Sequence, residues 1–183
     1  KVLVEQDRDR LAVVAPTARM TDPRLHVEVE VPAGSRVGVE TDSAGLVVTG
    51  SVEAVQAKSG SGDLSIERAG DAHLTSGSGD VTVGLLGGRA RVSAGSGDVH
   101  LGHVETAAKV KTGSGDVEIG VPDDVAVWTD VRTGSGDVTS TVDGRGAHAR
   151  GAPHVDLRVS TGSGDVALVR AEAQPFIATP SRQ

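Results

Sequence analysis

Apolar and polar residues alternate along most of the chain, which is the pattern of β-strands with one buried face. After each of several glycine-rich turns the sequence runs apolar, variable, apolar, as in Val81-Thr82-Val83. The residues before the turns alternate in the same way, as in Ala90-Arg91-Val92. The pattern therefore predicts two short strands for every turn.

The turns share the sequence Gly-Ser-Gly-Asp, which occurs six times and ends at Asp63, Asp80, Asp98, Asp116, Asp137 and Asp165. The first four copies recur every 17 or 18 residues, and residues 41–46 form a degenerate copy ahead of them. A unit this short cannot bury its own apolar side chains and must stack on neighbouring units. We therefore expect an all-β fold, a parallel β-solenoid resembling a β-helix, with about seven short two-strand coils.

The repeats occupy only part of the chain. We expect residues 1–35 to form an N-terminal β cap over one open end, residues 36–170 the solenoid, and residues 171–183 a C-terminal tail or cap in which Phe176 closes the other end. A meander of antiparallel hairpins is the structural alternative, because hairpin turns also favour Gly and Asp.

The last two intervals between turns lengthen to 21 and 28 residues. The extra residues, 122–124 and 144–153, have the composition of loops. We expect them to leave the solenoid as loops, with successive coils lying directly on one another in chain order.

The glycines of the turns are interpreted as structural. They are expected to permit the positive φ that a sharp corner needs, while the Ser and Asp side chains bond nearby backbone N–H groups. These glycines are Gly60, Gly62, Gly77, Gly79, Gly95, Gly97, Gly113, Gly115, Gly134, Gly136, Gly162 and Gly164.

The composition restricts the core and the partners. Trp128 and Phe176 are the only aromatic residues, so burial must depend on Val, Leu, Ile and Ala. The net charge of -7 argues against a nucleic-acid partner, because such binding needs Lys and Arg at the phosphates. No apolar run is long enough for a transmembrane segment. The absence of Cys excludes thiolate sites and fits either a reducing or an oxidising compartment.

A metal site is one hypothesis for the turns. In a stack the six turn Asp residues would form a column of carboxylates about 4.8 Å apart, repelling one another by about 0.9 kcal/mol in water. Asp63, Asp80, Asp98, Asp116, Asp137 and Asp165 are thus weak candidates for calcium ligands, and a calcium-stabilised β-roll surface protein is an alternative function. Only one turn per coil carries Asp, whereas calcium takes six to eight oxygen ligands, so the structural role is favoured and no other cofactor is expected.

A mildly basic stripe follows the outward positions of the pre-turn strands, where Gln56 and His73 accompany Lys58, Arg91, Lys109, Lys111, Arg132 and Arg158. One interpretation is a solvated sheet face kept soluble by charge. The other is a docking face for an acidic partner or an anionic polymer. Trp128 should also point outward and could anchor a partner.

No catalytic motif is found. The chain has no nucleophile elbow, P-loop or dinucleotide-binding fingerprint, and no set of nucleophile, base and orienting residue. We therefore expect no enzyme but a structural or interaction module, a scaffold for a protein partner or for self-association. A carbohydrate-active β-helix enzyme is the second alternative, although one Trp is few for a sugar-binding groove.

The run Val29 to Val37, the recurring Thr-Gly-Ser-Gly-Asp-Val units and the late segment Trp128 to Gly134 appear together in the order seen in a bacterial adhesin-like family of β-strand repeat proteins. The chain resembles this family over most of its length. The resemblance implies a parallel β-solenoid of unknown function without established catalytic residues. It leaves the compartment open, with the cytoplasm favoured over the cell surface.

Overall fold

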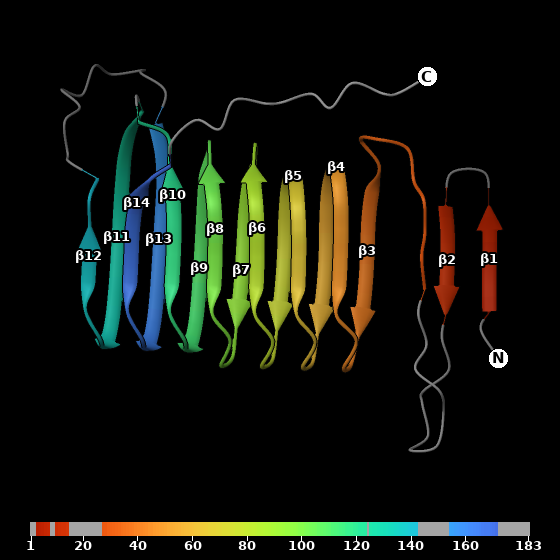
Figure 1. Cartoon of the computed structure of the whole chain (residues 1–183), viewed down its shortest axis with the longest axis horizontal. Helices are drawn as coiled ribbons and strands as arrows, with labels where there is room; N and C mark the ends of the chain where they lie inside the picture. The colour runs from red at the N-terminus through yellow and green to blue at the C-terminus, as the bar shows by residue number, and fades with distance from the viewer. Residues whose placement is uncertain (1–2, 8–9, 15–26, 124, 143–153, 172–183) are drawn as a thin grey trace, which may run out of the picture. The chain divides into compact units, whose positions relative to one another are not determined.

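The protein is described from a computed structural model, which describes residues 3–7, 10–14, 27–123, 125–142 and 154–171. The chain divides into two compact units, Lys1–Val31 and Pro32–Gln183. Every described element in both units is a β-strand (Figure 1). Within the described residues there is accordingly no helix with the length and apolar character to cross a membrane.

Among its described residues, the first unit contains one antiparallel strand pair. Strands β1 (Leu3–Asp7) and β2 (Arg10–Val14) pair with Leu3 opposite Val14. Residues 27–31 form no strand, and their three valines are exposed. That this part of the chain covers an open end of the solenoid stays a prediction, and the proposed role of Phe176 lies outside the described residues.

The second unit is a parallel β-solenoid of seven coils, each made of a strand, a turn and a second strand. We call the strands before the turns the pre-turn sheet; it contains β3 (Arg36–Thr41), the ends of β4 (Leu46–Ser59) and β5 (Leu64–Ser76), β7 (Arg89–Ala94), β9 (Ala107–Ser114), β13 (His154–Ser163) and β11 (Ala126–Ser135). The post-turn sheet contains the starts of β4 and β5, with β6 (Val81–Leu86), β8 (Val99–Val104), β10 (Val117–Val121), β14 (Val166–Arg170) and β12 (Val138–Ser140).

All strand pairs that the structure describes within the solenoid are parallel, and the register is continuous except for one shift between Val48 and Ser51, where β4 pairs with β5. The predicted solenoid is therefore confirmed, and the antiparallel meander is wrong for this unit. The register places equivalent residues of neighbouring coils side by side, so that each alternating position of the sequence forms a row across the strands.

The core is a thin layer between the two sheets. Its buried hydrophobic residues are all Val, Leu, Ile or Ala, and side chains such as Leu74, Leu101 and Ile119 are fully buried. Buried hydroxyls occupy the inward position just before several turns. Ser76, for example, accepts a hydrogen bond from the Gly79 N–H at 3.0 Å and donates one to the Gly79 carbonyl at 2.8 Å. The Ser76 hydroxyl thus provides hydrogen-bond partners for the Gly79 backbone, which the neighbouring apolar side chains could not provide.

The order of the last two coils differs from the predicted chain order. Strand β13 lies between β9 and β11, and β14 lies between β10 and β12. The coil with Asp165 therefore sits directly on the coil with Asp116, and the earlier coil with Asp137 forms the end of the stack (Figure 1). The prediction that the coils stack in chain order is therefore wrong for these two coils, and the loops expected at residue 124 and at 144–153 lie outside the described residues.

Burial of apolar surface explains this exchange of order. Leu157 and Leu168 face the core in the inserted coil and are almost fully buried. The residues in register with them in the end coil are Thr129 and Ser140, which are exposed. Because full burial of one Leu side chain stabilises a fold by about 1.5 to 3 kcal/mol, the more apolar coil belongs inside the stack.

The turn glycines are required chiefly by the closeness of stacked backbones. A Cβ placed on any of the twelve would lie only 2.1 to 2.6 Å from a carbonyl oxygen of the coil beneath. Positive φ, the predicted reason, occurs among them only at Gly115, Gly136 and Gly164. The prediction of positive φ is thus wrong for the other turn glycines, where the lack of space between coils excludes a side chain.

Replacing a stacked turn glycine should therefore lower the free energy of unfolding by more than the conformational restriction of the backbone alone would. Gly97→Ala would put its Cβ 2.2 Å from the Gly79 carbonyl oxygen, so we expect a loss of about 3 kcal/mol or more in urea unfolding. Gly38→Ala is the control, because Gly38 lies within β3 with nothing within 4 Å of the new methyl group. Equal stabilities of the two variants would contradict the account of the corners.

The exchanged order of coils can be tested by cross-linking, since the chain has no Cys of its own. Lys111 and Ser160 are in register on adjacent strands, so a Lys111→Cys, Ser160→Cys variant should form an intramolecular disulfide on mild oxidation. Lys111→Cys with Arg132→Cys should not, because two strand spacings, about 9.6 Å, separate those positions. Peptide mass mapping after non-reducing proteolysis distinguishes the two; stacking in chain order predicts the opposite result.

Candidate functional site

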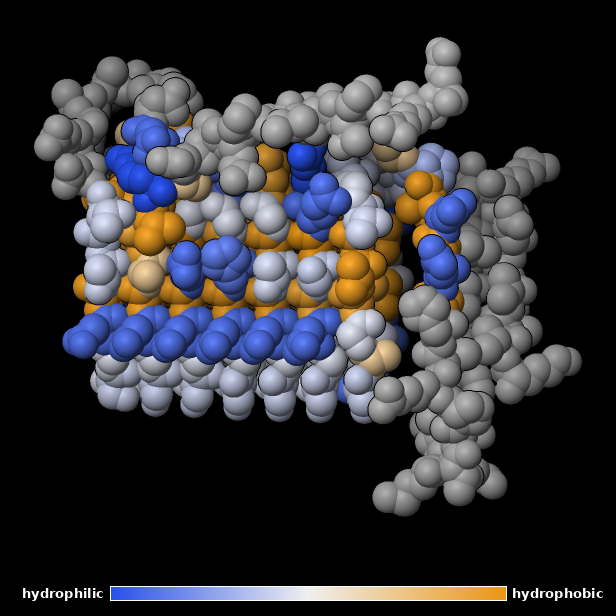
Figure 2. All heavy atoms as spheres, in the orientation of Figure 1, coloured by the Kyte–Doolittle hydropathy of each residue, from blue (hydrophilic) through white to orange (hydrophobic). Residues whose placement is uncertain are grey.

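The turn Asp residues form a continuous hydrogen-bonded ladder along one edge of the solenoid. Except at Asp63, which begins the row, the backbone N–H of each Asp donates to Oδ1 of the Asp in the adjacent coil, at 2.8 to 3.0 Å. The spatial order is Asp63, Asp80, Asp98, Asp116, Asp165, Asp137. We call this row the Asp ladder; it appears in Figure 2 as a line of strongly hydrophilic side chains along the turn edge.

The ladder explains why Asp recurs at the end of the turn. A hydrogen bond from a backbone N–H to a carboxylate is stronger than one between neutral groups, and each such bond offsets repulsion from the neighbouring carboxylates. Within the described ranges, no three His, Asp or Glu side chains come together in a way that could hold a metal ion. The hydrogen bonds between coils give the ladder a structural part in the corner, and calcium binding stays a prediction from the sequence.

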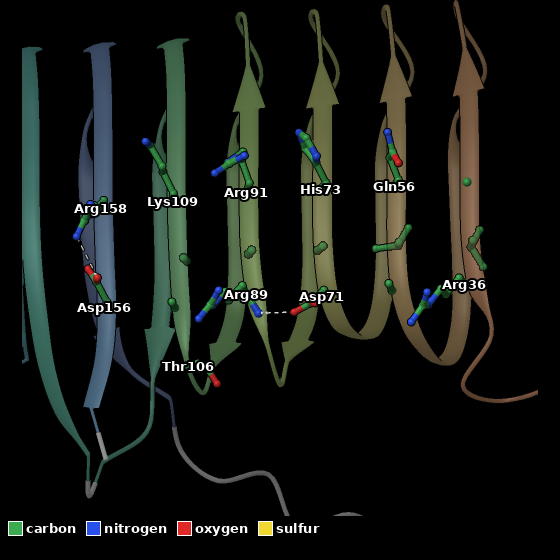
Figure 3. A pocket seen from close by; sticks show the side chains of 18 of the residues that line it. Arg36, Gln56, Asp71, His73, Arg89, Arg91, Thr106, Lys109, Asp156 and Arg158 are labelled. Atoms are coloured by element: carbon green, nitrogen blue, oxygen red, sulfur yellow. Dashed lines mark hydrogen bonds and ion pairs between the residues drawn. The ribbon is translucent and has the colours of Figure 1, made fainter. Parts of the chain in front are cut away.

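The second candidate site is a row of cations on the outer face of the pre-turn sheet. His73, Arg91, Lys109 and Arg158 occupy equivalent positions on β5, β7, β9 and β13, each in register with the next. We call these four residues the basic row. Their side chains stand on four successive coils and project from the same face (Figure 3).

The row continues at both ends with residues that are not cations. Gln56 of β4 and Gly38 of β3 precede His73, while Asp130 of β11 follows Arg158. The positive charge is thus confined to the central part of the stack, where one strand spacing of about 4.8 Å separates neighbouring cations.

Carboxylates near the row neutralise it only in part. Arg158 bonds Asp156 at 3.3 Å, while Asp71 Oδ1 accepts the backbone N–H of Arg89 at 2.8 Å. Neither Arg91 nor Lys109 makes an ion pair with any residue that the structure describes. Lys111, one position further along β9, also lacks one there. Adjacent cations without local partners are what an incoming anion would recognise.

A shallow trough of about 880 Å³ runs across the same strands and contains the basic row. It exists because small residues, Gly38, Ala54 and Ala107, occupy outward or flanking positions among the longer side chains. The basic side chains therefore stand among the smaller ones on a shallow, open part of the sheet (Figure 3).

Two further cations of the predicted stripe, Lys58 and Arg132, are engaged with neighbours. Lys58 bonds Glu40 at 2.8 Å, which lowers the pKa of the Glu40 carboxyl and raises that of the Lys58 ammonium. Arg132 bonds Asp130 at 3.1 Å. Both pairs are exposed, so they belong to the solvated surface and contribute little to stability.

Trp128 lies on the outer face of the end coil, with its side chain 57% exposed. Its ring centroid is 6.3 Å from that of His154, with the two ring planes tilted by 55°. The indole is thus outward-facing, next to the end of the basic row rather than within it, because Trp128 precedes Asp130 by two residues on β11.

Four charged trough residues were missed by the sequence reasoning. Asp71, Arg89 and Asp156 precede the stripe positions His73, Arg91 and Arg158 by two residues, so alternation places them on the same face. Extending the period-two pattern one step toward the start of each strand would have found these three.

Arg36 is the fourth, and it precedes Gly38, which is in register with Gln56. Arg36 forms a fork with Glu53 at 2.8 and 3.2 Å, and this hydrogen bonding lowers the pKa of Glu53.

The comparisons with known proteins give one match. The family model Toastrack DUF4097, a domain of unknown function, matches residues 26–169. The search of curated proteins and the search of solved structures found none. The β-strand repeat character expected from the resemblance is thereby supported, whereas the adhesin label is not confirmed. Since the match spans most of the chain and the whole solenoid up to β14, the chain belongs to the Toastrack DUF4097 family.

Proposed function

We propose that this Toastrack domain is a non-enzymatic interaction scaffold whose pre-turn sheet binds an acidic protein surface. The observation that carries the proposal is the basic row, three permanent cations and one histidine in register on successive coils, two of them without an ion-pair partner among the described residues. The regular stack serves to hold these charges at fixed spacing.

The electrostatics of the row favour an anionic partner. Unit charges about 4.8 Å apart repel by about 0.9 kcal/mol in water and by about 3.5 kcal/mol at an effective dielectric of 20. Placing Arg91, Lys109 and Arg158 side by side therefore disfavours the free protein slightly, and carboxylates docked between them would relieve the repulsion. A surface kept only for solubility has no need to align like charges.

The chemistry of the trough favours protein over nucleic acid or sugar. None of its lining residues is Trp, Tyr or Phe, so bases and sugar rings find no stacking platform there. The net charge of -7 also opposes long-range attraction of a highly charged polyanion. A carboxylate-bearing protein surface requires neither of these features.

The proposal predicts that the domain binds an acidic peptide through the basic row. A fluorescent oligoglutamate peptide should bind in anisotropy titrations at low salt, and Arg91→Gln with Lys109→Gln should weaken binding about tenfold, because two unpartnered charges are removed. Ser65→Glu with Thr82→Glu lowers the net charge by the same two units on the exposed post-turn face and should change affinity much less.

Equal weakening by both double variants would show that only net charge matters, and would contradict a specific basic site. Absence of any oligoglutamate binding by the wild-type domain at low salt would reject the acidic-partner proposal outright. Thermal melts show whether each variant is folded under the conditions of the binding measurement.

A further inference from the structure

We infer that the acidic surface that fits the trough is the Asp ladder of a second copy of this chain. The inference deepens the proposed function and depends on it, since the basic row remains the receiving site. It commits to one partner because the two rows match in charge and spacing.

The two rows have the same spacing because each contains one residue per coil of the same solenoid. The Asp ladder and the basic row each contribute one side chain per coil, and both run across parallel strands in register. Successive carboxylates and successive cations are thus both about 4.8 Å apart. A second copy laid alongside can bring three carboxylates opposite Arg91, Lys109 and Arg158 at once, whereas a partner with a different repeat would lose alignment after the first pair.

The carboxylates of the ladder retain an oxygen atom that can accept an ion pair from a partner. Five of the six ladder Asp residues, all but Asp137 at the end of the row, accept the N–H of the next coil, and they do so through Oδ1. No hydrogen bond or ion pair within the described part of the chain engages Oδ2 of any of the six. All six ladder residues are exposed. Figure 2 shows an unbroken line of strongly hydrophilic side chains at the turn edge, bordered by a row of weakly polar ones.

The position of the ladder leaves it accessible. It lies on a corner of the coil, and the residue before each of its Asp residues is a turn glycine without a side chain. The basic row lies in the trough of about 880 Å³. Asp71 and Asp156 are the unfavourable charges in that trough, and each is already bonded within the sheet, to the Arg89 N–H and to Arg158.

The contact joins two different surfaces, so it is heterologous and does not have to stop at two copies. Exposed ion pairs contribute at most about 1 kcal/mol each, so association should be weak and sensitive to salt. Raising the salt from about 0.01 M to about 0.15 M shortens the screening length from about 30 Å to about 8 Å and should dissociate the complex.

Sedimentation velocity over a range of protein concentrations tests the inference with two double variants. Asp80→Asn with Asp98→Asn keeps each Oδ1 acceptor of the ladder and removes two negative charges. Arg91→Gln with Lys109→Gln removes two positive charges from the trough. We expect wild type to associate at low salt, and each double variant alone to associate at least about tenfold more weakly.

A mixture of the two double variants is the decisive sample in this sedimentation experiment. The Gln variant retains an intact ladder and the Asn variant an intact trough, so the mixture should recover association that neither shows alone. The Ser65→Glu, Thr82→Glu variant should associate as wild type does. A wild type that stays monomeric at low salt, an Asn variant that associates normally, or a mixture without recovery would each overturn the inference.

Oligoglutamate binding distinguishes a failure of the self-association inference from a failure of the proposed acidic-partner function. If wild type and the Asn variant bind the peptide while neither self-associates, the trough is an acidic-partner site and the second copy is the wrong occupant. If the peptide does not bind either, the basic row itself is not a docking site, and both proposals fall.

Discussion

The contact between backbones at the turn corners is the constraint from which the rest of this structure follows. At Gly79 and Gly97 the corner of one coil lies so close to the next that a Cβ would meet a carbonyl oxygen at 2.2 to 2.3 Å. Such proximity is available only to glycine. It fixes the register between coils, and because register is fixed at the corner, every inward and outward position along the strands is fixed with it.

Because the register between coils is fixed, a residue that recurs once per coil in the sequence forms a continuous row on the surface. One residue per coil at the turn becomes the Asp ladder, and one per coil at the middle of the pre-turn sheet becomes the basic row. The same geometry that lets a backbone N–H reach the carboxylate beneath it brings like charges close together on two separate surfaces. An acidic domain thus carries a local basic trough and a local acidic row with equal spacing.

Much of this arrangement could be predicted from the sequence, and the parts that could not have physical reasons. The two strands per turn, the Val and Leu core and the outward basic positions follow from period-two alternation. The reason for the glycines was misjudged, because the spacing between coils is not visible in a local sequence. The order of the last two coils was also missed, since both carry the same turn and either can stack on the coil with Asp116. The information was nevertheless present: Thr129 and Ser140 make the earlier coil the poorer one to bury.

The most direct test of stacked corners is amide hydrogen exchange measured residue by residue by NMR. The account predicts that the amides of Asp80, Asp98, Asp116, Asp165 and Asp137 exchange as slowly as those of the neighbouring core strands, because each donates to a carboxylate of the adjacent coil. The amide of Asp63 should exchange faster, since Gly45 at the equivalent position has no carboxylate to accept it. Exchange of all six at the rate of open loops would contradict the central claim.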